Sequence, residues 1–131
     1  MISSGVFDYI NVLNKAADAS WLKETAITNN ISNVNTPNYK RIDVDFESLL
    51  SKELGKGSIQ SLDKKISAMN ADLENLNAST YTDSASYSYR LDGNNVDIDS
   101  ENVELASEQI RYQALTSSIS GGFASLKAVI K

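Results

Sequence analysis

The chain of 131 residues contains no cysteine, no histidine and a single proline. Without cysteine there is no disulfide and no thiolate nucleophile, and without histidine there is no imidazole base. Nearly all zinc sites are excluded for the same reason, because their ligands are chiefly cysteine and histidine. Most enzyme chemistry therefore has no side chains to perform it, and we expect no catalytic residue, no cofactor and no metal.

Positive charge and long apolar runs are also scarce. The chain has 12 Lys and Arg against 17 Asp and Glu, which gives a net charge of −5. Nucleic acid and anionic membranes bind clustered basic residues, so neither partner is expected. No apolar stretch approaches the roughly 18 residues of a membrane span, and the first residues lack the basic start and apolar block of a secretory signal.

Apolar side chains that recur in steps of four and three predict a long N-terminal helix. The stripe lapses at Ser20 and Glu24 and otherwise comprises Val6, Ile10, Leu13, Ala17, Ile27, Ile31 and Val34. The residue before a proline is pushed toward extended geometry, so the helix should end near Val34 or Asn35. Thr36 to Tyr39 then fit a type II turn, in which Asn38 takes a positive φ.

A stripe of the same period predicts a second long helix at the end of the chain. It comprises Leu105, Gln109, Tyr112, Thr116, Ile119, Phe123, Leu126 and Ile130. Asp99 is the expected N-cap, and Lys127 lies near the negative end of the helix dipole. Gly121 and Gly122 cost roughly 1 kcal/mol each relative to alanine, so either the helix bends there or a neighbour's backbone packs close.

The middle of the chain is expected to be partly irregular. Its apolar residues at helical spacing predict a third helix of about five turns: Ile59, Leu62, Ile66, Met69, Leu73 and Leu76. Alternation at Tyr87, Tyr89 and Leu91 weakly indicates a short strand. The fold class is mainly α, with the terminal helices paired as a coiled-coil-like hairpin. One structural unit comprises an N-terminal helix (1–36), a turn and loop (37–50), a variable middle (51–93) and a C-terminal helix (94–131).

Two groups of carboxylates have alternative interpretations. Asp43, Asp45 and Glu47 alternate after the turn, which suits acid–base chemistry or a hard cation, but no histidine or second cluster supports that interpretation. Four further acids match ligand positions of a calcium loop: Asp97, Asp99, Glu101 and Glu108. Asn102 replaces the glycine that such a loop needs, and a helix begins inside it. Capping and helix-dipole roles explain these acids better.

The predicted helices are expected to pair through their stripes. Residues of the first helix face residues of the second across a seam made by Val6, Ile10, Leu13, Ile27 and Ile31 on one side and Leu105, Tyr112, Ile119, Phe123 and Leu126 on the other. These side chains alone bury too little surface to order two long helices. We therefore expect helices that are partly disordered in the monomer and that become ordered on assembly with neighbours.

Two stretches resemble the flagellar rod and hook protein family. Residues 29–50, NNISNVNTPNYKRIDVDFESLL, resemble the family signature of an Asn-rich helix end followed by a Thr-Pro-Gly-Tyr type turn. The continuation Lys40-Arg41-x-Asp43-x-Asp45-Phe46 is similar to the FlgB branch of proximal-rod proteins, as is LDGNNVDIDSENVELASEQIRYQAL at residues 91–115. Asn38 stands where the family usually has glycine, and the segment before Leu91 lacks a proline often found in relatives.

The resemblance implies a structural subunit of the flagellar basal body, not an enzyme. Such subunits polymerise around the export channel and transmit torque from motor to hook. They lie outside the cytoplasm, in the periplasm or cell wall region, after export through the flagellar type III channel without a cleaved signal. The implied partners are other rod subunits, of its own and the FlgC type, FliE, the FliF membrane ring and the export apparatus.

The resemblance also assigns the turn motif, which comprises Asn33, Asn35, Thr36, Pro37, Tyr39, Lys40, Asp45 and Phe46. Through it, Tyr39, Lys40 and Phe46 are expected to touch an adjacent subunit, and the asparagines to bond to neighbouring helices. Three alternatives stay open at this point: a sister rod protein of the FlgC type, a soluble helical adaptor or secretion chaperone, and a calcium-binding module.

Overall fold

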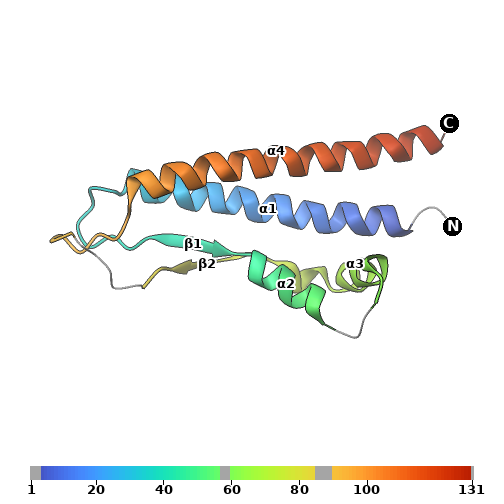
Figure 1. The fold of residues 1–131 in the computed structure, drawn as a ribbon, viewed down its shortest axis with the longest axis horizontal. Coiled ribbons are helices and arrows are strands. Elements are labelled where there is room, and N and C mark those ends of the chain that lie inside the picture. The colour runs from blue at the N-terminus through green and yellow to red at the C-terminus, as the bar shows by residue number, and fades with distance from the viewer. Residues whose placement is uncertain (1–3, 57–59, 85–89, 131) are drawn as a thin grey trace.

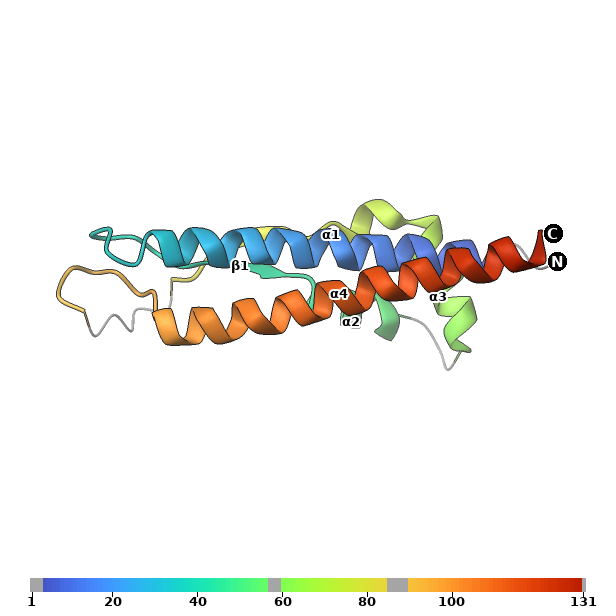
Figure 2. The ribbon, with the colours of Figure 1, turned by 90° about the horizontal axis from the view of Figure 1, so that it is seen from above.

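The computed structural model describes residues 4–56, 60–84 and 90–130, which form an elongated hairpin of two long helices (Figure 1). Helix α1 (Ser4–Ser32) and helix α4 (Ile98–Val129) run antiparallel, so both chain ends lie at the same end of the molecule. The helices separate at the terminal end in Figure 1 and at the opposite end in Figure 2, so their axes wind slightly around each other. The predicted fold class is confirmed.

Helix α1 ends at Ser32, two residues before the predicted end. The hydroxyls of Thr28 and Ser32 donate to backbone carbonyls one turn back, at 2.8 Å each. The Asn33 amide is shared between the carbonyls of Asn29 and Asn30, at 3.1 Å each. Short polar side chains that bond to the local backbone favour such an early end. The predicted turn follows, and Asn38 has the expected positive φ of 61°.

Helix α4 begins after Asp97, not after Asp99 as predicted. The Asp97 backbone is extended, and its Oδ1 accepts from the amides of Asp99 (3.0 Å) and Ser100 (3.4 Å). Four aspartates or asparagines lie at positions 92–97 and Asp99 follows, so composition alone did not single out the capping residue. The helix then continues without interruption through Gly121 and Gly122.

The two glycines meet different surroundings. A Cβ on Gly122 would lie 3.2 Å from both Cγ1 and Cδ1 of Ile10, whereas nothing lies within 4 Å of one on Gly121. The close approach predicted at this point therefore exists, but it comes from an α1 side chain and not from a backbone.

This difference gives a matched pair of substitutions. Gly121→Ala should raise the free energy of unfolding by about 0.5–1 kcal/mol, because alanine is the better helix former. Gly122→Val should lower it by about 1–3 kcal/mol, because the added methyls crowd buried Ile10. Urea unfolding followed by circular dichroism measures both changes. A stabilised Gly122→Val variant would contradict the close packing of Gly122 against Ile10.

The middle of the chain packs on α1, mostly on the side away from α4 (Figure 1). It contains strand β1 (Ile42–Asp45), helix α2 (Glu47–Gly55), helix α3 (Leu62–Ala71), the 3-10 turn η1 (Leu73–Leu76) and strand β2 (Ser79–Thr82). The strands form an antiparallel ribbon in which Ile42 pairs with Thr82 and Asp45 with Ser79.

The predicted third helix is shorter than expected. Helix α3 ends at Ala71, because Asp72 adopts φ −134° and ψ 53° and the chain continues as a 3-10 turn. The Asn75 side chain donates to the Asp72 carboxylate, a local bond that competes with helix formation. Leu91 lies in a turn, while Tyr87 and Tyr89, the other residues of the predicted strand, lie outside the described residues.

Helix α3 and η1 cover α1 through a small apolar cluster and several polar contacts. Ile66, Met69 and Leu76 are buried against Val12 of α1. Around them, Tyr9 Oη donates to Asp63 and Asn11 Nδ2 to Asn70, both at 2.7 Å. Within the described ranges, none of the helices combines the length and apolar character that crossing a membrane requires.

Candidate assembly site on the helix pair

The ten predicted seam residues differ in how deeply they are buried. Ile10 and Ile27 are buried in the subunit, and Phe123 is half exposed. The other seven are partly buried: Val6, Leu13, Ile31, Leu105, Tyr112, Ile119 and Leu126. The Tyr112 ring lies 6.1 Å from that of Trp21, which joins the two helices at the edge of the seam. The role of these residues as a contact between subunits stays a prediction.

The fully buried residues that α4 contributes are two glutamates. Glu101 is 1% exposed and Glu108 is 3% exposed, and they lie seven residues apart on the side that faces α1. Buried carboxylates are costly unless they are paired and hydrogen-bonded, so their partners decide whether the seam is stable.

Glu101 is held by Arg41 and Asn30. The Arg41 Nε donates to Glu101 Oε1, and Asn30 Nδ2 donates to Glu101 Oε2 at 3.0 Å. Asn30 also bonds to both backbone groups of Ile42, at 2.8 and 2.9 Å, and accepts from Tyr39 Oη at 3.1 Å. One buried asparagine of α1 therefore fixes the start of β1, the turn tyrosine and the first turns of α4.

Arg41 is the centre of a cluster of acids. Its guanidinium also bonds to Asp43 and Glu104, at 2.9 Å each, and lies 3.7 Å from Asp83. Burial by itself tends to lower the pKa of Arg41, but the bonds to Glu101 and Asp43 outweigh it, so the pKa is raised above its ordinary value. The arginine therefore stays charged and neutralises acids from β1, from α4 and from the segment after β2.

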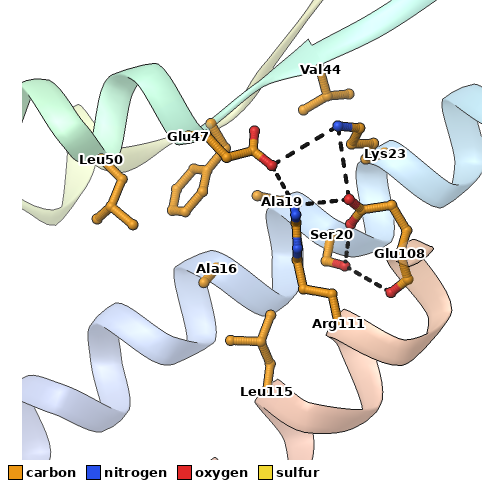
Figure 3. A pocket seen from close by; sticks show the side chains of 11 residues that line it. Ala16, Ala19, Ser20, Lys23, Val44, Glu47, Leu50, Glu108, Arg111 and Leu115 are labelled. Carbon is orange, nitrogen blue, oxygen red and sulfur yellow. Dashed lines mark hydrogen bonds and ion pairs between the residues drawn. The ribbon is translucent and has the colours of Figure 1, made fainter. Parts of the chain in front are cut away.

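Glu108 is held at a second point of the seam (Figure 3). Ser20 Oγ donates to Glu108 Oε2 at 2.9 Å, and Oε1 lies 2.8 Å from Arg111 and 3.8 Å from Lys23. The lapse of the apolar stripe at Ser20 is thus the position that receives this carboxylate. The contacts of Glu101 and of Glu108 form at the same time only in one register of the two helices. A shift of one helix along the other would therefore leave buried charges unpaired.

A cavity of about 220 Å³ lies beside Glu108, between α1, the start of α2 and α4 (Figure 3). Its walls include Val44, Phe46, Leu50 and Leu115, and the charged ends of Lys23, Glu47, Glu108 and Arg111 pair with one another at its edge. An apolar space whose charges are already paired suits packing better than acid–base chemistry.

Two carboxyl groups near the seam have pKa values below their ordinary 3.8 and 4.5. Burial tends to raise the pKa of Asp43. The hydrogen bond from the Val44 amide and the charge and hydrogen bond of Arg41 lower it by more, so the net shift is downward. Burial likewise opposes the lowering at Glu47, where its own amide, Lys23 and Arg111 prevail. Both groups bind protons less readily in the folded chain than in the unfolded chain.

Acid should therefore destabilise the fold. Because both folded pKa values are depressed, the stability that these groups contribute is complete above their unfolded pKa values and is lost as the pH falls through about 4 and below. Urea unfolding at a series of pH values should show this decline, and Asp43→Asn should make it shallower. An equal decline in the variant would contradict the role of Asp43.

Most turn-motif residues lie at the end of the hairpin opposite the chain termini. Asp45 is the last residue of β1, and Phe46 follows it. Asn35, Thr36, Pro37 and Lys40 are exposed, whereas Phe46 is 7% exposed and lines the cavity. The Asn33 side chain, just after α1, donates to the Asn29 carbonyl in the last turn of that helix at 2.8 Å, and Asp45 accepts from Ser48 at the start of α2. The expected contact of Tyr39, Lys40 and Phe46 with another subunit stays a prediction.

Sequence reasoning missed Asn94, which is fully buried. Its Nδ2 lies within 2.8–3.1 Å of the carbonyls of Asn33, Val34 and Thr36, so it caps the end of α1 from far along the chain. Gly93 beside it has φ 76°, and a Cβ there would lie 2.8 Å from Asn38 Oδ1. The sequence Asp92-Gly93-Asn94 is typical of a turn, but it does not identify the end of α1 as the partner of Asn94.

Three of the four acids that match positions of a calcium loop bond to groups of the chain itself. Asp97 caps α4, Glu101 binds Arg41, and Glu108 binds Ser20 and basic side chains. Among residues 4–56, 60–84 and 90–130, no three acidic side chains are grouped so as to hold a metal ion.

Large apolar side chains remain exposed on the described surface. A groove of about 540 Å³ at the end that carries the termini is lined by Phe7, Phe123, Leu126, Lys127 and Ile130. Elsewhere, Trp21 is 61% exposed, and Val103 and Ile110 on α4 are about as exposed. Exposed apolar surface of this extent typically marks a site of contact with other proteins.

Comparison with known proteins gives a consistent result. No protein-family model matches the chain. The flagellar basal body rod protein FlgB of Bacillus subtilis is 38% identical over 127 residues, which cover 92% of each chain. FlgB of Borreliella burgdorferi is 32% identical over 93% of this chain and 95% of its own, and FlgB of Escherichia coli is 28% identical over 83% of each. The chain therefore belongs to the FlgB family of flagellar basal body rod proteins.

Proposed function

We propose that this chain is a structural subunit of the proximal part of the bacterial flagellar rod. Copies of it polymerise around the export channel and transmit torque from the motor to the hook. The observation that carries the proposal is similarity along nearly the whole chain to proteins named as rod components. The register-fixed helix pair, with apolar side chains left on its surface, supplies a unit suited to such assembly.

The neighbours of the chain follow from the same proposal. Rod subunits of its own and the FlgC type, FliE and the FliF ring are the expected contacts, at a position outside the cytoplasm that is reached without a cleaved signal. The role is structural and not enzymatic, since the charged side chains of the described seam and cavity pair with one another. Ordering of the helices on assembly stays a prediction, testable by the helix content of the purified monomer.

Fractionation of cells tests the proposed function. In cells that lack the native gene, an epitope inserted at exposed Gly55 of α2 leaves both chain ends free. The tagged protein should restore swimming and should co-purify with detergent-extracted basal bodies. A cytoplasmic adaptor or secretion chaperone would instead stay in the soluble fraction. Swimming without the protein in purified basal bodies would overturn the proposal.

A further inference from the structure

Strand β2 has backbone groups that point away from its partner strand. The Asp83 amide donates to the Arg41 carbonyl at 2.8 Å, directly beyond the terminal pair of the ribbon, Ile42 with Thr82. Hydrogen-bonded and non-bonded pairs alternate along an antiparallel ribbon, so Thr82 and Thr80 both belong to non-bonded pairs. Their N–H and C=O groups are therefore directed to the outer side of β2.

The two outer edges of the ribbon differ in how they are covered. On β1, the Asn30 side chain bonds to the N–H and C=O of Ile42, at 2.9 and 2.8 Å, and the Val44 amide donates to the side chain of the preceding residue at 2.7 Å. Strand β2 is exposed along its length and lies on the side of β1 away from α1 and α4 (Figure 1). Among the described residues, none bonds to the outward groups of Thr80 and Thr82.

The sequence of β2 leaves this edge open to another strand. It is Ser-Thr-Tyr-Thr, whose β-branched and aromatic residues favour extended backbone. It contains neither the lysine nor the proline that commonly blocks an exposed edge. An added strand can supply the missing backbone partners. Since Thr80 and Thr82 each offer one donor and one acceptor, the contact is short and reversible.

Charge around the ribbon selects the kind of strand that fits. Tyr81 Oη lies 3.5 Å from Asp43 Oδ2, and side chains alternate between faces, so Asp45 and Asp83 share this solvent face. The nearby basic side chains are already bound: Lys23 to Glu47 and Glu108, Lys40 to the Gly93 carbonyl, and Arg41 to Asp43, Asp83, Glu101 and Glu104. Acids exceed bases here, so an edge-to-edge second copy is repelled and a basic strand is attracted.

We propose that the outer edge of β2 binds an extended segment of another protein, with basic side chains on the face that carries Asp43 and Asp45. The segment bonds to the backbone of Thr80 and Thr82 and adds one strand to the two-stranded ribbon. The inference goes beyond the proposed function, because it concerns the ribbon and not the helix pair. It holds whether or not the chain is part of the rod.

Amide hydrogen exchange followed by NMR tests the geometry on the full chain. Without a ligand, the Tyr81 amide should exchange about ten-fold or more slowly than those of Thr80 and Thr82, because it alone bonds to β1. The probe is the acetylated and amidated peptide Lys-Val-Lys-Val-Lys-Val. At ten times its Kd, it should slow the Thr80 and Thr82 amides by about ten-fold. The same peptide with glutamate in place of lysine should bind about five-fold more weakly.

Two substitutions at one position test the outward donor. Thr82→Pro removes that N–H without removing a bond to β1, and it should weaken peptide binding about five-fold, the effect of one hydrogen bond. The matched control Thr82→Val keeps the N–H and should bind within about two-fold of the original chain.

A change in the peptide alone avoids any effect on folding. N-methylation of one alternate set of its amides should abolish binding, and N-methylation of the other set should not, because only every second amide faces β2. Equal loss with both sets, or no binding of the original peptide, would overturn the inference. Protection of Thr80 and Thr82 in the peptide-free chain by self-association would overturn it too, since a second copy would then be the occupant. The basal-body fractionation result is independent of all these measurements and decides the proposed function separately.

Discussion

Replacing Arg41 with alanine is expected to lower the free energy of unfolding by about 3–5 kcal/mol, the range for removing one partner of a buried ion pair. The Arg41 side chain is 15% exposed, and its removal leaves the nearly inaccessible Glu101 carboxylate with no basic partner from the seam. Folded domains are typically stable by about 5–15 kcal/mol, so a chain whose helices are expected to be only partly ordered before assembly would lose most of its folded population.

Urea unfolding with circular dichroism measures this loss, and two variants sharpen it. Lys56→Ala removes an exposed pair with Glu53 and should change stability by no more than about 0.5 kcal/mol. Adding Glu101→Leu to Arg41→Ala should recover part of the loss, because the unpaired charge is then absent. If Arg41→Ala costs no more than Lys56→Ala, the Arg41 cluster does not stabilise the seam.

Replacing Ile119 with aspartate is expected to exclude the chain from the rod and to stop swimming, while export of the protein continues. Ile119 is partly buried on α4 and lies between the seam positions Tyr112 and Leu126. A carboxylate there lacks the basic partners that Arg41 and Arg111 provide to Glu101 and Glu108. An unpaired charge at this place should separate the helices that assembly requires.

Leu105→Asp should have the same effect, and Gln109→Asp is the matched control, because Gln109 is exposed on the same helix. Swim-ring diameter and the protein content of isolated basal bodies measure the outcome. Detection of the variant in the culture medium shows that export is retained. Normal swimming of the Ile119→Asp strain would show that the seam is not needed for assembly.

The repeating features of the fold could be predicted from the sequence. Steps of three and four specify both long helices, since each needs only its own apolar stripe. Pro37 with Asn38 specifies the turn, because φ is fixed at one residue and tolerated as positive at the next. These are local rules, and α1, α4 and the φ of Asn38 obey them.

The contacts that fix the helix register depend on residues far apart in sequence, and they were missed. The predicted stripe on α4 includes Gln109, which is exposed, while its neighbour Glu108 is buried. A hydrophobic pattern cannot assign a carboxylate to the seam unless its partner is known. The ribbon of β1 and β2 was missed for a similar reason, because β2 is exposed along its length and shows no alternation.

The antiparallel order of α1 and α4, with both chain ends on one side, makes the response to mechanical force depend on direction. A force that separates the two termini would peel the helices apart one contact at a time, beginning beside Phe7. A force along the hairpin would load the Glu101 and Glu108 contacts together in shear, which is the stiffer mode. A rod made of such subunits is therefore most resistant when its helices lie along the line of stress.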